Sequence, residues 1–214
     1  AAAVRTALAA DWCELEAADN NGYTAFIFAC HKGHVECMQL LADAGCNTAA
    51  KDHDGYTALI HAAIFGNSAA AVRTALAADW CELEAADNNG YTAFIFACHK
   101  GHVECMQLLA DAGCNTAAKT NSGGTALIHA ACSGVAAAVR TALAADWCEL
   151  EAADNNGYTA FIFACHKGHV ECMQLLADAG CNTAAKDHGG HTALMHAAIS
   201  GVAAAVCTAL AAGW

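Results

Sequence analysis

One stretch of this chain occurs three times without a single change of residue. The three copies, which we call the identical repeats, occupy residues 19–51, 87–119 and 154–186. Related but non-identical segments, which we call the variable repeats, alternate with them at residues 52–86, 120–153 and 187–214. A chain of tandem copies stacks one small unit on the next, so its length sets the number of units and not the number of globular domains.

Both ends of the sequence fall inside a repeat. Residues 1–18 match the second half of a variable repeat, and residues 187–214 end within the same half. We therefore expect one repeat domain over residues 1–214, with five complete units, a half unit at the N-terminus and a truncated unit at the C-terminus. Five complete units exceed the roughly three that stacking needs for stability. The sequence looks like an excerpt from a longer array.

Turn and helix signals recur at fixed places in each identical repeat. Residues 19–22 read Asp-Asn-Asn-Gly, a tight-turn sequence, because Asp and Asn bond their own backbone and Gly accepts a positive φ. Thr24 is placed to cap a first short helix, which Gly33 ends. A second helix is predicted over residues 35–44, before Gly45. Neither helix is long enough to be stable alone in water, so each needs its neighbours.

The amino-acid sequence of the identical repeat resembles the ankyrin repeat. The shared pattern is Asp-x-x-Gly-x-Thr, then Ala, then Gly-His, then paired leucines and a closing Gly, at Asp19, Gly22, Thr24, Ala29, Gly33, His34, Leu40, Leu41 and Gly45. The resemblance covers essentially all 214 residues, and its recurrence in register makes it specific. It implies an all-α fold, a solenoid built of helix-turn-helix-hairpin units.

The chain departs from the family pattern just after the capping threonine. Where the family has Pro-Leu-His, residues 25–27 read Ala-Phe-Ile. In the first variable repeat the corresponding residues read Ala-Leu-Ile, and the histidine moves on to His61. The hydrogen bonds between threonine and histidine that are usual in the family are therefore not predicted here.

Tryptophan recurs once in every second unit, at Trp12, Trp80, Trp147 and Trp214. Because the side chain is large and usually buried over most of its surface, we expect these four residues to cover the thin core. Contact with a ligand is the alternative role for them.

The net charge limits the kinds of partner that the chain can bind, and the cysteines indicate its compartment. Nine basic against twenty-one acidic side chains give a formal net charge of −12, which repels a phosphate backbone. We therefore expect a monomer that binds a neutral or basic protein and no nucleic acid.

Polar residues interrupt every long apolar stretch, so no membrane span is predicted. Fourteen cysteines without a secretory signal are expected to be reduced thiols, which favours the cytoplasm.

Cysteine and histidine gather at the corner between the two helices of each identical repeat, from Cys30 to Cys37. Zinc sites usually present cysteines about two to four residues apart in one loop, whereas these two fall on the core stripes of two helices. We interpret them as core residues and expect no metal, no cofactor and no disulfide. No nucleophile, base and carboxylate form a singular set, and a solenoid offers a shallow groove, so the chain is not expected to be an enzyme.

In ankyrin repeat proteins the partner lies on the concave face, which the hairpin tips and the exposed ends of the first helices form. The resemblance implies this role for the matching positions Tyr23, His53, Asp54, Tyr56, Ile64, Phe65, Asn88, Asn89, Tyr91, His99, Lys100, Asn121, Ser122, Tyr158, His188 and His191. Most differences among the variable repeats fall at such positions, through drift at exposed sites or diversification for binding. We expect Ile64 and Phe65 to be exposed and, with Tyr56 and Tyr91, to carry most of the binding energy.

Two functions remain open from the sequence. The first is a non-enzymatic scaffold that binds a partner protein through the hairpin tips and helix ends. The second is a rigid structural spacer within a larger multidomain protein. Tyrosine beside asparagine at the predicted tips favours the scaffold, because rigid aromatic area combined with adaptable hydrogen bonding is typical of binding surfaces.

Overall fold

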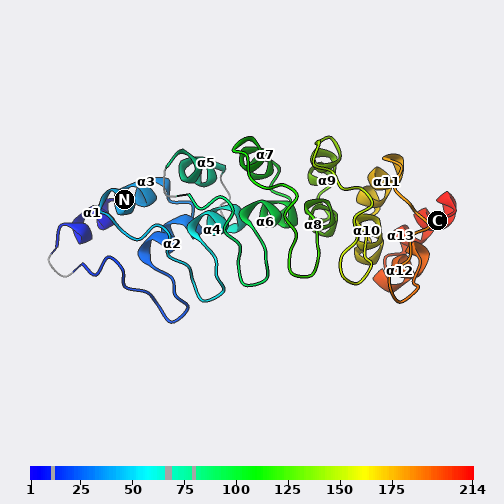
Figure 1. Ribbon diagram of the computed structural model, residues 1–214, viewed down its shortest axis with the longest axis horizontal. Coiled ribbons are helices and arrows are strands. Elements are labelled where there is room, and N and C mark those ends of the chain that lie inside the picture. The colour runs from blue at the N-terminus through cyan, green and yellow to red at the C-terminus, as the bar shows by residue number, and fades with distance from the viewer. Residues whose placement is uncertain (11–12, 66–68, 79–80) are drawn as a thin grey trace. The chain divides into compact units, whose positions relative to one another are not determined.

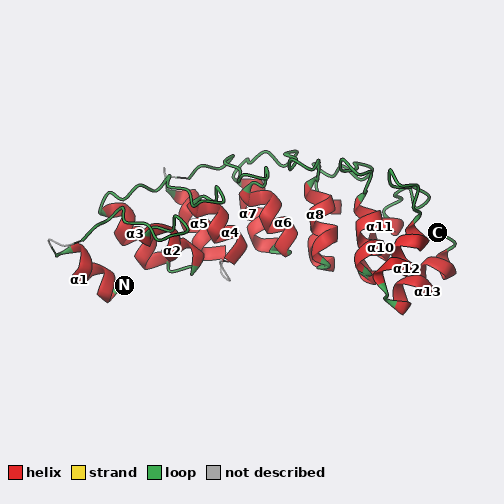
Figure 2. Ribbon diagram, turned by 90° about the horizontal axis from the view of Figure 1, so that it is seen from below, coloured by secondary structure: helices red, strands yellow, loops and turns green. Residues whose placement is uncertain are grey.

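The computed structural model describes residues 1–10, 13–65, 69–78 and 81–214 (Figure 1). Within these residues the regular structure is thirteen helices and no strand (Figure 2), which confirms the expected all-α fold. Two compact parts make up the chain. The N-terminal part is Ala1–Phe96 with Glu104–Asn115, and the C-terminal part is Ala97–Val103 with Thr116–Trp214. No helix in the described residues is long and apolar enough to cross a membrane.

After a single helix α1 (Ala2–Leu8), the helices follow one another in pairs. The first helices of the pairs are α2 (Ala25–His31), α4 (Ala58–Phe65), α6 (Ala93–Lys100), α8 (Ala126–Ser133), α10 (Ala160–Lys167) and α12 (Ala193–Ser200). The second helices are α3 (Val35–Asp43), α5 (Ala69–Ala77), α7 (Val103–Asp111), α9 (Ala136–Leu143), α11 (Val170–Asp178) and α13 (Ala203–Ala212). A hairpin separates successive pairs, so the predicted order of helix, turn, helix and hairpin is confirmed. The division into five complete units stays a prediction.

A threonine begins the first helix of a pair. Thr24 Oγ1 accepts a hydrogen bond from the backbone N–H of Ile27 at 3.3 Å, and Thr159 does the same for Ile162. Such a cap satisfies an N–H group that the helix itself leaves unpaired and contributes about 1 kcal/mol. Extended backbone at the cap joins the helix to its hairpin, where Ala18 and Thr24 form an antiparallel bridge.

The first residue of a hairpin closes the turn with its side chain, and within each part neighbouring hairpins are joined by a backbone hydrogen bond. Asp19 Oδ1 accepts hydrogen bonds from the backbone N–H groups of Asn21 and Tyr23, both at 2.9 Å. Gly22 has a φ of 85°, and a Cβ on it would lie 2.9 Å from the imidazole of His53 in the next hairpin. The backbone N–H of His53 donates to the carbonyl oxygen of Asn21 at 3.0 Å. This bond fixes the spacing of adjacent tips.

The core is a thin layer between successive helix pairs. Phe26, Ile27 and Cys30 of α2 are buried, as are Met38 and Leu41 of α3. In the N-terminal part α2 packs against both α3 and α4, and in the C-terminal part α10 packs against α8, α11 and α12. Within each part, a helix pair thus buries its apolar side chains mainly against neighbouring pairs.

The cysteines contribute to this core as small apolar side chains. Cys30 and Cys37 are buried, which confirms the interpretation of both as core residues. No disulfide joins any of the fourteen cysteines, all of which lie in the described residues. Burial raises the pKa of Cys30 and of Cys165 to about 12, so these thiols stay protonated at neutral pH. A protonated, buried thiol is a poor nucleophile and a poor metal ligand.

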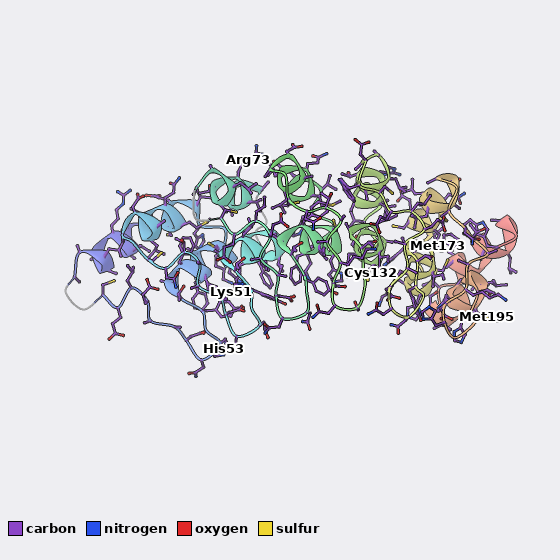
Figure 3. All side chains as sticks on the ribbon, viewed as in Figure 1. Lys51, His53, Arg73, Cys132, Met173 and Met195 are labelled. Atoms are coloured by element: carbon purple, nitrogen blue, oxygen red, sulfur yellow. The ribbon has the colours of Figure 1, made fainter. Side chains whose placement is uncertain are left out.

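Exposed ion pairs join α1 to α3, α5 to α7 and α9 to α11. They connect an arginine with a glutamate of the following identical repeat, at Arg5–Glu36, Arg73–Glu104 and Arg140–Glu171. Arg73 lies on the side of its repeat away from the hairpins (Figure 3). All six side chains are more than half exposed, so each pair contributes at most about 1 kcal/mol.

The last helix pair exposes apolar side chains that inner pairs bury. Ile128 in α8 is buried, whereas its counterpart Met195 in α12 is 51% exposed. Figure 3 labels Met195 in this last helix pair. No further helix pair of the described chain covers this side of α12. The tryptophans differ as well: Trp214 lies edge-on to the buried Phe161 with 4.9 Å between ring centroids, and Trp147 is half-buried. Trp12 and Trp80, expected to cover the core, lie outside the described residues.

We predict that deletion of residues 187–214 leaves residues 1–186 folded, because α10 and α11 keep their contacts with α8 and α9. The urea midpoint should fall modestly, since one interface between neighbours is lost. Circular dichroism and urea titration of both chains measure the helical signal and the midpoint. A shortened chain without helical signal would show that contacts between neighbours do not account for folding.

Candidate protein-binding surface

The hairpin tips and the ends of the first helices gather aromatic side chains in the N-terminal part. The ring centroid of Tyr23 lies 5.1 Å from that of Phe28. His31, at the end of α2, stacks on Phe65, at the end of α4, with 4.1 Å between centroids. We call Tyr23, Phe28, His31 and Phe65 the aromatic cluster. Phe28 is 44% exposed and Phe65 42%, so the cluster presents apolar area to solvent.

Two further tyrosines extend this surface along the N-terminal part. The rings of Tyr56 and Tyr91 lie 5.2 and 4.8 Å from the ring of Phe96. Phe96 is itself buried, and both tyrosines are half-buried. Packing on Phe96 holds the two tyrosine rings in place, which lowers the entropy that they would lose on binding.

Shallow hollows lie beside the aromatic side chains in both parts. In the N-terminal part a hollow of about 480 Å³ is lined by Asp19, Asn21, Tyr23, Phe28, His31, His53 and Asp54. In the C-terminal part a hollow of about 440 Å³ is lined by Asp154, Asn156, Tyr158, Phe163, His166, Lys167, Asp187, His188 and Gly189. His53 stands at the outer end of its hairpin (Figure 3). Hollows of this size accept a side chain or short segment of a partner.

Carboxylates give the surface of the N-terminal part a negative character. Backbone hydrogen bonds from Tyr23 and Asn21 lower the pKa of Asp19, so its carboxyl group is ionised at neutral pH. Burial and the nearby Asp87 raise the pKa of Tyr56, whose hydroxyl group therefore remains a hydrogen-bond donor. The surface combines aromatic area, neutral donors and negative charge.

A buried histidine supports the aromatic cluster from below. His61 is fully buried, and its Nε2 lies 2.9 Å from Asp52 Oδ2. Its Nδ1 lies 3.4 Å from Nδ1 of His31. The carboxylate thus orients one histidine, which in turn orients a member of the aromatic cluster. The sequence analysis missed this chain of contacts, although an aspartate and a histidine nine residues apart in the first variable repeat were a usable signal.

The middle variable repeat lacks the aspartate of this arrangement. Thr120 stands at the position of Asp52, and its Oγ1 accepts the backbone N–H of Gly124 at 3.0 Å. The histidine is retained as His129. Burial, with a smaller effect of His99, lowers the pKa of His129 to about 4. His129 is therefore neutral across the physiological range of pH.

The last variable repeat adds a histidine to the arrangement. Asp187 Oδ2 lies 3.0 Å from Nε2 of His196 and 2.9 Å from Nδ1 of His191. Burial opposes ionisation of Asp187, but hydrogen bonds from both histidines outweigh it and hold the pKa of the carboxyl group well below its usual range. One nitrogen or oxygen atom from each of the three side chains lies within 4.8 Å of the others.

The structure places most of the residues predicted from the sequence at the hairpin tips and helix ends. Eight are exposed tip residues: His53, Asp54, Asn88, Asn89, Asn121, Ser122, His188 and His191. Tyr23, Tyr56, Tyr91, Tyr158 and His99 are half-buried, and Phe65 and Lys100 are exposed. The expected exposure of Ile64 is wrong, because its side chain is only 6% exposed within the core. The sequence analysis also missed Phe28, which faces solvent two positions after the buried Phe26.

A family model described as ankyrin repeats in three copies matches the chain at residues 2–79, 68–147 and 138–213. The three matches together extend over nearly the whole chain. The resemblance to ankyrin repeats that was inferred from the repeated sequence is thereby confirmed. No curated protein matches the chain.

We predict that Thr120→Asp makes the protein more resistant to mild acid. Because the pKa of folded His129 is lowered to about 4 from its ordinary value of 6.5, the unfolded state binds more protons between these values. Stability is therefore present above pH 6.5 and is lost as the pH falls toward 4, by up to ~3 kcal/mol from this residue. An aspartate at position 120 should pair with His129 as Asp52 does with His61, raise its pKa and reduce this loss.

Urea unfolding of the wild type and the variant at pH 7.5 and at pH 5 measures the effect. Gln107→Ala, an exposed change on α7, serves as the control and should leave the pH dependence as it is. An equal acid-induced loss of stability in Thr120→Asp and wild type would contradict the role of His129.

Proposed function

This chain belongs to the ankyrin repeat family, and on that premise we propose that it is a non-enzymatic scaffold that binds a partner protein. Proteins built of these repeats are in general modules of protein–protein interaction. The binding surface we propose consists of the hairpin tips and the ends of the first helices. Its centre is the aromatic cluster, extended by Tyr56 and Tyr91.

The observation that carries this proposal is the exposure of two phenylalanines that pack against other members of the aromatic cluster. Phe28 and Phe65 are each more than two-fifths exposed, and Tyr23 and His31 contact them. Apolar aromatic side chains held by packing lose little conformational entropy when a partner covers them. Such residues usually dominate the energy of an interface.

The partner we propose is neutral or basic and offers an apolar side chain to the aromatic cluster. The chain has a formal net charge of −12, and Asp19 and Asp54 line the hollow beside Tyr23. Negative charge at the rim accelerates the approach of a basic partner and makes its binding sensitive to salt. The same charge disfavours nucleic acid.

We propose further that the protein acts as a monomer in a reducing compartment such as the cytoplasm. Eight of the fourteen cysteines are buried, and six of these eight lie within helices. Disulfides form and persist in oxidising compartments, where a chain with so many thiols would be at risk of cross-linking. The second candidate, a rigid spacer, is favoured by the three identical repeats, which would give a constant geometry.

We predict that Phe28→Ala with Phe65→Ala weakens binding of basic peptides by about 1–3 kcal/mol for each side chain. Peptides selected from a random display library against the wild-type chain provide the ligands, and fluorescence anisotropy measures their dissociation constants. The selected sequences should be rich in Lys or Arg and contain an aromatic or aliphatic anchor. Urea unfolding should show little loss of stability, because both phenylalanines are exposed.

Gln39→Ala, on the exposed side of α3, is the matched control and should leave peptide affinity unchanged. Peptide binding that survives the double phenylalanine variant but disappears in Gln39→Ala would move the site to the other side of the repeats. A chain from which no specific peptide can be selected would favour the spacer.

A further inference from the structure

A three-residue cluster in the last variable repeat has the composition and spacing of a metal site. Asp187 Oδ2 lies 2.9 Å from His191 Nδ1 and 3.0 Å from His196 Nε2. Two ligand atoms about 2.1 Å from one metal ion, at right or tetrahedral angles, are themselves roughly 3 Å apart. Two imidazoles and one carboxylate are a ligand set suited to Zn²⁺ and similar divalent ions. We propose that Asp187, His191 and His196 bind such an ion.

The fold holds two of these ligands rigidly and leaves the third at the surface. Asp187 opens the hairpin, and its Oδ1 accepts the backbone N–H of His191 at 2.8 Å. His196 lies in α12, four residues after the capping Thr192. The side chains of Asp187 and His196 are 5% and 1% exposed, whereas that of His191 is 49% exposed. An ion can enter from the side of His191 and complete its coordination with water.

The other ring nitrogen of His196 is already engaged. His196 Nδ1 lies 3.3 Å from Nδ1 of His166 at the end of α10. A metal-binding histidine usually forms such a hydrogen bond with the nitrogen that does not bind the ion, and the bond orients the ring. His166 therefore acts as a positioning residue that leaves Nε2 of His196 for the ion. The ion would take the place of the proton between His196 and Asp187.

Two sequence differences in the same hairpin create the third ligand. The counterpart of His191 is a tyrosine in all three identical repeats and at Tyr56, and it is Gly124 in the middle variable repeat. In each of the remaining repeats the counterpart of Gly189 is a residue with a side chain, for example Asp54. A Cβ on Gly189 would lie 2.7 Å from Cε1 and 2.8 Å from Nδ1 of His191. The glycine thus leaves the space that the imidazole needs to reach Asp187.

The first variable repeat is an internal comparison for this site. Asp52 and His61 reproduce the pair of Asp187 and His196, with Nε2 2.9 Å from Oδ2. His61 Nδ1 contacts His31 as His196 contacts His166. Tyr56 and Asp54 stand in place of His191 and Gly189. The two repeats therefore differ in the third ligand while they share the buried pair and its support.

The test is a titration of the whole chain with Zn²⁺ at pH 7.5 by calorimetry, in wild type and His191→Tyr. Tyrosine is native at this position in four repeats, so the variant is expected to fold. Wild type should bind one more Zn²⁺ than His191→Tyr. Gly189→Ala, which keeps all three ligands but displaces the ring of His191, should weaken this binding event by more than about tenfold.

The converse variant adds the missing ligand to the first variable repeat. Asp54→Gly with Tyr56→His makes residues 52–56 identical to residues 187–191. This variant should bind a second Zn²⁺ with an affinity similar to that of the first site. Co²⁺ in place of Zn²⁺ should give no intense sulfur-to-cobalt absorption for either site, which separates them from the cysteines.

Equal stoichiometry and affinity in wild type and His191→Tyr would overturn the proposal, because any bound Zn²⁺ would then reside elsewhere on the chain. A wild type that binds no Zn²⁺ would overturn it as well, and the three side chains would be a hydrogen-bonded cluster only. Loss of one equivalent in His191→Tyr, together with its gain in the converse variant, would establish the site.

Discussion

Burial of one helix pair against the next, within each compact part, is the interaction on which the rest of this structure depends. The described helices are 7 to 10 residues long, too short to persist in water alone. α10 packs against α8, α11 and α12, and α2 packs against α3 and α4. Backbone hydrogen bonds between adjacent hairpins, such as that from His188 N–H to the carbonyl oxygen of Asn156 at 2.9 Å, add a fixed spacing at the tips. Every functional side chain discussed above is positioned by this stacking.

A constant frame lets a single residue change the chemistry of a repeat. The histidine nine residues after the start of a variable hairpin is kept in all three copies as His61, His129 and His196. Opposite an aspartate it is part of an oriented hydrogen-bonded chain, and opposite Thr120 burial lowers its pKa to about 4. Opposite Asp187, with His191 added, the same position becomes part of the ligand cluster. The three variable repeats therefore differ in chemistry while they share one backbone arrangement.

The tips were predictable from the sequence, and the helix faces were less so. Gly22 predicts the turn and Thr24 predicts the helix cap. In the structure Gly22 has a positive φ, and Thr24 accepts the capping hydrogen bond. Ile64 was expected in solvent because it precedes the end of a helix, yet every residue of α4 except Phe65 is buried. A helix enclosed by neighbours has no broad solvent face, so reasoning from one exposed face fails for it. Phe28 was not singled out from the sequence, and only the packing of α2 shows that this side chain faces solvent while Phe26 is buried.

What the sequence determined by itself is the local structure: the repeat, its turns, its caps and the order of its helices. These depend on hydrogen bonds that join residues no more than about four positions apart. Only the tertiary structure decided that His31 meets His61, that His166 meets His196 and that Phe65 stacks on His31. Such contacts join different repeats, and they depend on the distance and rotation between successive helix pairs. Both quantities result from the packing of all side chains at the interface together, which no short pattern of residues encodes.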